Sequence, residues 1–462
     1  MTDLIVCGGT VVTAGGSRRA DVAVDGGRIA AIGADLGADA HEVVDATGLL
    51  VLPGVVDVHT HTRVATDAEP DRFFQDSVAA AFGGTTTFLA FNNPGTGVSV
   101  AGGRTLLAGL REWRSLTEGD TAVDYAVSLV VTPFQEDAIA EIPAAVELGV
   151  PTFKVFMVYD FGLDDRRLYH ALAMAGASGG MLEVHCENAV MLEELTARHL
   201  EAGEIAPRFH AMSRPSYVEA EATVRAIAYA RAARAPLYVV HLSCGEALNA
   251  VRAGRAEGLP VFAETCPQYL TMDDTRYLLP PEEAARYIIS PPLRAPGEPA
   301  LLWAGLADGS LSLIATDHVP DRVGIEKQSW KESFDRISNG SPGIETLLAL
   351  AYAEGVVGGR ITVERMVDLL STTPARLFGL NDKGALEVGR DADLVLFDPS
   401  VPRVIRQADL HHSSDYTPFE GREVVGAVRS VAVRGAWVVR DGAFVGRRGG
   451  GRFVERQLER MT

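Results

Sequence analysis

Five side chains that can bind a metal ion stand at the ends of short apolar runs of this chain. They are His59, His61, His185, His241 and Asp317. Because successive side chains of a strand point to opposite faces, His59 and His61 would share one face and could chelate a single ion. One His-x-His pair arises easily by chance among 11 histidines. Four apolar runs that all end at a possible ligand form a stronger pattern, and they predict a metal site.

Lys154 lies inside another apolar run, at residues 150–159. A charged ammonium is costly in such surroundings, and it has only donors, so it cannot bind a metal ion. Burial favours the neutral amine, which can add carbon dioxide to give a carbamate whose two oxygens could bridge two cations. A snorkelling or ion-paired lysine is the alternative. The sequence by itself leaves both interpretations open.

Eight apolar runs must position these side chains, and helix-period segments lie between most of them. The clearest helix is predicted over residues 218–234, which are rich in alanine. Strands that alternate with helices are typical of an α/β fold of the (β/α)8 TIM-like barrel type, whose active site lies where the strands end. The predicted strands are residues 55–61, 85–91, 125–131, 152–159, 181–186, 237–241, 261–264 and 312–316.

The two ends of the chain differ from this middle. Residues 1–53 and 389–448 contain short runs rich in Val and Ile that are separated by Gly turns, which predicts strands. Together they predict one small β-sandwich domain built from both termini. The barrel is expected over residues 54–388, and a tail over residues 449–462. The expected terminal strands are residues 3–12, 21–24, 28–32, 392–397, 427–434 and 436–440.

The composition limits the partners and the location. The formal net charge is −19, from 42 basic and 61 acidic residues, which disfavours a nucleic-acid partner. The apolar runs are shorter than the roughly 20 residues of a membrane span, and the N-terminus lacks the features of a signal peptide, so no membrane partner is expected. Four cysteines without CxxC spacing indicate a reducing compartment. A cytoplasmic protein is therefore predicted.

Several longer strings surround the candidate ligands. They are KVFMVY at 154–159, ETCPQYL at 264–270, SPPLR at 290–294, ISNG at 337–340, PGIE at 342–345, HH at 411–412 and DYTPFEG at 415–421. Together with the candidate ligands, these strings resemble the dihydropyrimidinase and hydantoinase family of cyclic amidohydrolases. The resemblance covers nearly the whole chain, and its motifs are specific in combination.

The resemblance implies two divalent metal ions per subunit. One ion would be bound by His59, His61 and Asp317, and the second by His185 and His241. N6-carboxylysine at Lys154 would bridge the two ions, together with a hydroxide. Zinc suits imidazole and carboxylate-type ligands, as do manganese, cobalt and nickel.

The implied reaction is hydrolysis of a cyclic amide bond by that bridging hydroxide. The substrate would be a small molecule, either a 5-substituted hydantoin or a 5,6-dihydropyrimidine. Asp317 would carry a proton to the leaving nitrogen, and Tyr159 would hydrogen-bond the oxyanion. Ser290 and Asn339 would bind the ring amide through backbone groups. The implied assembly is a homotetramer.

Some segments depart from this family. Arg63 and the string FNNP at residues 91–94 instead resemble dihydroorotases, in which such an arginine meets a substrate carboxylate. The alternative for Arg63 is a salt bridge to Asp67 or Glu69. The segments at 64–71 and 317–321 also differ from those of hydantoinases, and they fall in loops, where specificity resides.

Two other functions therefore stay open beside the hydantoinase interpretation. One is an allantoinase or dihydroorotase-like activity, which Arg63 and residues 92–93 favour and Tyr159 disfavours. The other is a non-catalytic scaffold of the same fold. The filled set of candidate ligands disfavours the scaffold, because such proteins have lost their metal ligands.

Overall fold

Eight apolar runs of the sequence form the parallel strands of one sheet. The computed structural model describes residues 2–37, 39–92 and 105–459. The strands are β8 (Val55–Thr60), β9 (Thr85–Phe91), β10 (Asp124–Val130), β11 (Thr152–Phe156), β12 (Met181–His185), β13 (Leu237–Val239), β14 (Val261–Thr265) and β15 (Leu313–Ile314), hydrogen-bonded in this order. Thr60 also pairs in parallel with His318, which closes the sheet into a barrel. The predicted (β/α)8 barrel is confirmed.

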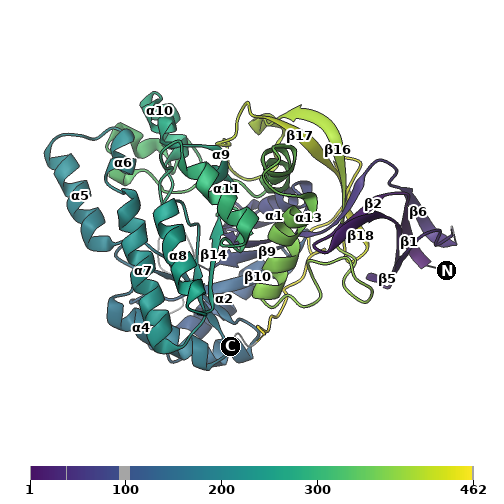
Figure 1. The fold of residues 1–462 in the computed structure, drawn as a ribbon, viewed down its shortest axis with the longest axis horizontal. Helices are drawn as coiled ribbons and strands as arrows, with labels where there is room; N and C mark the ends of the chain where they lie inside the picture. Colours follow the sequence, from purple (N-terminus) through teal and green to yellow (C-terminus); the bar gives the residue numbers. More distant parts are fainter. Residues whose placement is uncertain (1, 38, 93–104, 460–462) are drawn as a thin grey trace.

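Helices cover the outside of the barrel, which explains why its strands are almost continuously apolar. They are α1 (Arg72–Phe82), α2 (Leu106–Thr117), α3 (Ile142–Glu147), α4 (Asp165–Ala177), α7 (Ser216–Ala233), α8 (Gly245–Ala256) and α11 (Glu298–Asp308). Figure 1 shows α4, α7 and α8 side by side in this outer layer. The helix predicted over residues 218–234 is α7, and it ends where Arg234 adopts a left-handed conformation with a φ of 52°.

Long connections follow β12, β14 and β15, at the end of the barrel where such folds carry their sites. Their further elements are α5 (Ala189–Glu201), α6 (Arg208–Met212), α9 (Pro267–Thr271), η1 (Asp274–Leu278), α10 (Pro281–Ala284), η2 (Ala285–Tyr287), η3 (Gln328–Lys331), η4 (Phe334–Arg336), α12 (Leu347–Leu350), η5 (Ala351–Val357), α13 (Val363–Val367), η6 (Asp368–Thr372) and α14 (Thr373–Leu377).

Strands from both ends of the chain form two further sheets. One sheet has the order β5-β4-β1-β6, and the other has the order β19-β18-β17-β16-β7-β2-β3. In the second sheet β7 pairs with β2 on one side and with β16 on the other, so both ends of the chain share it. The strands are β1 (Thr2–Cys7), β2 (Thr10–Thr13), β3 (Gly16–Arg19), β4 (Asp21–Asp25), β5 (Arg28–Gly33), β6 (Ala40–Asp45), β7 (Leu50–Pro53), β16 (Leu394–Val404), β17 (Glu423–Val433), β18 (Ala436–Arg440) and β19 (Ala443–Phe444), with η7 (Gln407–Asp409) between β16 and β17.

One predicted terminal strand is wrong, because residues 3–12 form two strands and not one. Gly8 has a φ of 71°, a conformation open to glycine, and the chain turns there between β1 and β2. The turn places β1 in the four-stranded sheet and β2 in the seven-stranded sheet. Leu4, Val22 and Leu394 belong to one buried cluster that draws on both sheets, as expected for a sandwich.

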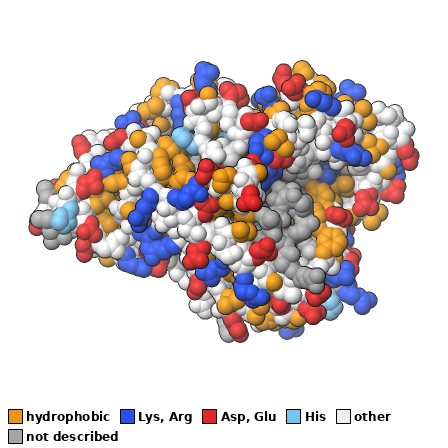
Figure 2. Space-filling view, turned by 180° about the vertical axis from the view of Figure 1, so that it is seen from behind, with side chains coloured by type: hydrophobic (Ala, Val, Ile, Leu, Met, Phe, Trp, Pro, Cys, Tyr) orange, Lys and Arg blue, Asp and Glu red, His pale blue; other side chains and the backbone are white. Residues whose placement is uncertain are grey.

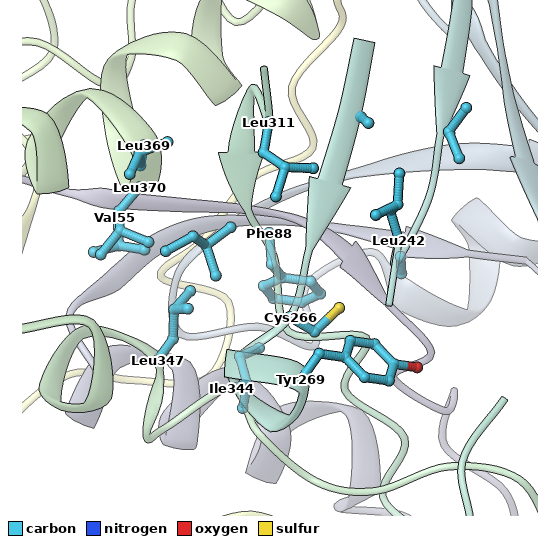
Figure 3. Close-up of a cluster of buried hydrophobic side chains, with 14 of the residues drawn as sticks. Val55, Phe88, Leu242, Cys266, Tyr269, Leu311, Ile344, Leu347, Leu369 and Leu370 are labelled. Carbon is cyan, nitrogen blue, oxygen red and sulfur yellow. The ribbon is translucent and has the colours of Figure 1, made fainter. Parts of the chain in front are cut away.

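A second buried cluster surrounds the barrel and joins it to the helical segments (Figure 3). Leu369 and Leu370 of η6 lie beside Val55 at the start of β8, and Leu347 of α12 belongs to the same cluster. This packing attaches η6 to the first barrel strand from outside the barrel.

The tail contacts the barrel near the starts of β10 and β11, at the end opposite to the one where the strands finish. The backbone N–H groups of Tyr125 and Val454 donate to the carbonyls of Arg452 and Tyr125, which ties the tail to the start of β10. Arg456 is buried, and it donates to the carbonyl of Val127 at 2.5 Å and to Oγ1 of Thr152 at 2.9 Å. The described part of the tail therefore packs against its own barrel; residues 460–462 lie outside the described chain.

The surface carries both signs of charge. On the face drawn in Figure 2, Lys and Arg side chains are interspersed with Asp and Glu side chains. Among residues 2–37, 39–92 and 105–459, no helix is both long and apolar enough to span a membrane.

Candidate active site

The candidate ligands meet at the C-terminal ends of the barrel strands. His59 and His61 come from β8 and the residue after it, and both Nε2 atoms approach Oδ1 of Asp317, at 3.0 and 3.2 Å. Three possible ligand atoms lie within 4.8 Å of one another, one each from His59, His241 and Asp317. All three residues are buried. These three side chains form a possible metal site. Of the predicted site residues, the structure thus brings His59, His61, His241 and Asp317 together at this end of the barrel.

Lys154 of β11 lies inside the barrel, close to His59. Its Nζ is 3.4 Å from Nε2 of His59, and it lies 4.7 and 5.1 Å from the ring centroids of Phe91 and Phe156. The residue is fully buried. Burial lowers the pKa of Lys154 and favours the neutral amine, the form that adds carbon dioxide.

Two carboxylates make the region around His59 favourable for positive charge. Glu264 contacts Nδ1 of His59, accepts a hydrogen bond from Tyr238 at 2.7 Å and accepts one from the backbone N–H of His241 at 3.1 Å. Burial and Lys154 lower the pKa of His59, but Glu264 and Asp317 outweigh them and raise it to about 9. A metal ion bound to His59 would take the place of that proton, and the same carboxylates would stabilise its positive charge.

His185 and His241 form the second pair of imidazoles, with ring centroids 4.5 Å apart. Nε2 of His185 lies 2.8 Å from Glu187, which leaves Nδ1 of His185 for another partner. Nδ1 of His241 is buried and has no hydrogen-bond partner among the described residues. Burial lowers the pKa of both imidazoles, so both are neutral, as a metal ligand must be. The donor set therefore fits a bound cation.

Tyr159 belongs to a buried polar network beside the ligands. Its hydroxyl donates to Oγ of Ser290 at 2.7 Å, and Ser290 donates to Glu187 at 2.7 Å. Arg214 donates to both Ser290 and Glu187, each at 2.7 Å. Sequence reasoning missed Glu187 and Arg214. Glu187 follows the strand two residues after His185 and could have been found by alternation, whereas Arg214 follows α6 and gives no such signal.

A cavity of about 330 Å³ opens above these residues. Its polar lining includes Tyr159, Ser290, Asn339, Asp317 and Arg63, so the predicted site residues of the pocket lie together. Oδ1 of Asn339 has no hydrogen-bond partner among the described residues. Much of the remaining wall is apolar and contains Val64, Phe91, Val130, Phe156, Phe161 and Val319.

Arg63 is paired, but not with the residues expected from its neighbourhood in sequence. Its guanidinium contacts Asp321 through Nη2 and Glu326 through Nη1, the latter at 2.6 Å. The expected salt bridge to Asp67 or Glu69 is wrong, because the loop after β15 brings closer carboxylates. Of the asparagines that suggested a dihydroorotase, Asn92 accepts a hydrogen bond from the backbone of Val130 at 2.8 Å. Residues 93 and 94 lie outside the described chain.

A barrel whose strand ends gather imidazoles, a lysine and an aspartate defines a candidate metal-dependent hydrolase. The sequence model of the Amidohydrolase family matches residues 148–438. Together with the full-length relatives described next, this match shows that the chain belongs to the hydantoinase and dihydropyrimidinase group of the amidohydrolase family.

The relatives are similar along their whole length. A D-hydantoinase of Geobacillus stearothermophilus is 41% identical, over 99% of this chain and 97% of its own. A D-phenylhydantoinase of Escherichia coli is 39% identical, over 98% of each chain. The crystal structure of a dihydropyrimidinase from Brevibacillus agri superposes with a TM-score of 0.94, at 41% identity and over 99% of both chains. The resemblance inferred from the sequence motifs is confirmed.

Proposed function

We propose that the chain hydrolyses the cyclic amide bond of a 5-substituted hydantoin or a 5,6-dihydropyrimidine. The observation that carries this proposal is the approach of His59, His61 and Asp317 beside Lys154, at the floor of a cavity that Tyr159 also lines. The names of the similar proteins, D-hydantoinase and dihydropyrimidinase, support the same substrate class.

The proposed cofactor is a pair of divalent ions, zinc by ligand type. His59, His61 and Asp317 would hold one ion and His185 and His241 the other, with carboxylated Lys154 between them. Such a pair supplies Lewis-acid polarisation of a carbonyl and a more acidic water. The unpartnered Nδ1 of His241 and the neutral state of its imidazole support this assignment.

The remaining steps fall to the side chains. Burial opposes ionisation of Asp317, yet the charge of His59 and the hydrogen bonds from His59 and His61 hold its pKa well below the ordinary value. Asp317 is therefore a carboxylate that can accept a proton from the attacking water and give it to the leaving ring nitrogen. The Tyr159 hydroxyl would donate to the oxyanion that forms on the ring carbonyl.

The ring amide would be bound by Ser290 and Asn339. Both residues line the cavity, and the free Oδ1 of Asn339 can accept from a ring N–H. Backbone groups of the same two residues can complete the amide recognition. This arrangement would fix the scissile bond over Asp317, and positioning of this kind is a large part of catalysis.

The allantoinase and dihydroorotase-like alternative is less well supported. It drew on Arg63 as a binding group for a substrate carboxylate, whereas Arg63 is already held by Asp321 and Glu326. The scaffold alternative is disfavoured because all six candidate ligand positions are filled by residues able to take part in a metal site.

The direct test is turnover by protein that has been loaded with zinc in the presence of bicarbonate. Dihydrouracil and a 5-substituted hydantoin should both be opened, with the carbamoyl amino acid as the product, and Asp317→Asn should lose that activity. If the loaded protein opened neither ring, the proposal would be refuted.

We also propose that the protein is a homotetramer and is located in the cytoplasm. Light scattering should then give a mass four times that of one chain.

A further inference from the structure

We propose that Asp321 and Glu326 are specificity-determining residues. They form ion pairs with the guanidinium of Arg63, and they thereby exclude substrates whose ring carries a carboxylate. The inference rests on the proposed function, because it concerns the choice among cyclic amides at the same site. It assigns a role to two residues of the loop after β15 that the reaction itself does not use.

Apart from the proposed metal ions at the floor, Arg63 is the cation that an entering anion would meet. Among the described residues that line the cavity, it is the one lysine or arginine. Its side chain is only 8% exposed, and its two terminal nitrogens are each engaged by a different carboxylate, Asp321 and Glu326. A substrate carboxylate would therefore have to compete with two carboxylates that are already in place.

Those two carboxylates are themselves held firmly. Glu326 also accepts hydrogen bonds from the backbone and side chain of Arg322, and Arg72 approaches it at 3.5 Å. Asp321 has a fully buried carboxylate that lies 3.7 Å from the Lys327 ammonium. Turning either side chain away from Arg63 would break several contacts at once, so displacement by a ligand is unfavourable.

The rest of the cavity offers a carboxylate little compensation. Arg214, whose guanidinium lies 5.8 Å from the centroid of the Tyr159 ring, is itself paired with Glu187 and Ser290. Beyond the polar floor the wall is formed by side chains such as Phe91, Phe156 and Phe161. An anionic substituent placed against that wall would lose its hydration without gaining a partner. Uncharged ring substituents have no such cost.

The test compares two rings that differ by one carboxylate, dihydrouracil and dihydroorotate. The wild-type kcat/KM should strongly favour dihydrouracil. The double variant Asp321→Asn, Glu326→Gln frees Arg63 and should raise the relative kcat/KM for dihydroorotate by about tenfold or more, through a lower KM. Adding Arg63→Met to the double variant should remove the gain.

Glu69→Gln is the matched control. Glu69 contacts Arg72 and Arg322 of the same rim but makes no contact with Arg63, so loss of its charge should leave the preference unchanged. If the double variant does not fold, the single variant Asp321→Asn should show a smaller gain of the same sign. Metal content measured on each variant excludes an effect that comes from the metal site.

Calorimetric binding of dihydroorotate separates this inference from the proposed function, because binding needs no turnover. Tighter binding by the double variant supports the inference even where no ring is opened. If the double variant binds dihydroorotate no more tightly than the wild type and keeps the same substrate preference, the inference is wrong. The proposed function still stands in that case, provided that dihydrouracil is hydrolysed. Equal use of both rings by the wild type would also overturn it.

Discussion

Three residues of the site adopt backbone conformations that side chains other than glycine rarely take. Tyr159, His241 and Asp317 have φ values of 72°, 38° and 51°. Each conformation of this kind costs about 1–3 kcal/mol, and it persists where the surrounding structure enforces it. All three residues follow barrel strands and line the cavity. Their left-handed turns aim side chains over the barrel end, where the proposed chemistry takes place.

Tyr159→Phe tests the proposed oxyanion donor. The hydroxyl would act on a charge that develops only during the reaction, so we expect kcat to fall by about 10²–10³ while KM changes much less. Steady-state kinetics with dihydrouracil measure both constants. Tyr169→Phe, at a tyrosine that is 36% exposed on α4, is the control and should behave as the wild type. An unchanged kcat in Tyr159→Phe would remove this residue from the mechanism.

The sequence allowed prediction of the residues that end strands, but not of the residues that support them. His59, His61, His185, His241 and Asp317 could be identified because each follows an apolar run. Arg214 and Asp321 come from loops and act on residues far away in sequence. Arg63, for example, meets Asp321 across 258 positions, and no local pattern encodes that contact.

At the scale of elements, all eight barrel strands were predictable, and the strand predicted over residues 85–91 has the observed bounds of β9. The C-terminal ends of most other strands were not predictable. Residues 237–241 and 312–316 were expected to be strands, but β13 ends at Val239 and β15 covers only Leu313–Ile314. His241 and Asp317 turn into left-handed conformations just beyond these strands. Hydrophobic runs continue past the last ladder hydrogen bond, because the buried turn that follows is also apolar.

The loop after β15 makes a prediction about pH. Partial burial raises the pKa of Glu326, but Arg322 and Arg63 outweigh it and lower the pKa from 4.5 to about 2. A lowered pKa means that Glu326 contributes stability above pH 4.5, which is lost as the pH falls towards about 2. The Tm difference between wild type and Glu326→Gln should therefore be constant near neutral pH and shrink in that acidic window. A difference that grows on acidification would contradict the assigned ion pairs.

For the whole molecule, the two ends of the chain are structural partners of the barrel. β7 leads directly into β8, and β7 itself lies between strands from the N-terminal and C-terminal parts. At the opposite end of the barrel Arg456 donates to Val127 and Thr152. The similar composition of the two ends predicted a shared sheet domain, but no local pattern indicated that a tail arginine would enter the barrel.

Arg456→Ala tests the contribution of the tail. The substitution removes the hydrogen bonds that the buried guanidinium donates to Val127, Thr152 and Phe378, and a hydrogen bond from a charged group contributes about 1.5–3 kcal/mol. We expect a Tm lower by several degrees, measured by differential scanning calorimetry. Arg447→Ala, at an exposed position just before the tail, should leave the Tm unchanged. Equal Tm values for the two variants would show that the buried guanidinium is dispensable.

The measurement that tests the central claim most directly is the metal content per chain of the wild type, Lys154→Ala and Lys331→Ala by elemental analysis. Lys331 is exposed, so its variant controls for loss of a lysine. The proposed bridged site predicts close to two ions in the wild type and in Lys331→Ala, and loss of most of the metal in Lys154→Ala. One ion or none in the wild type, unaffected by Lys154→Ala, would mean that the lysine is structural and that the proposed mechanism is wrong.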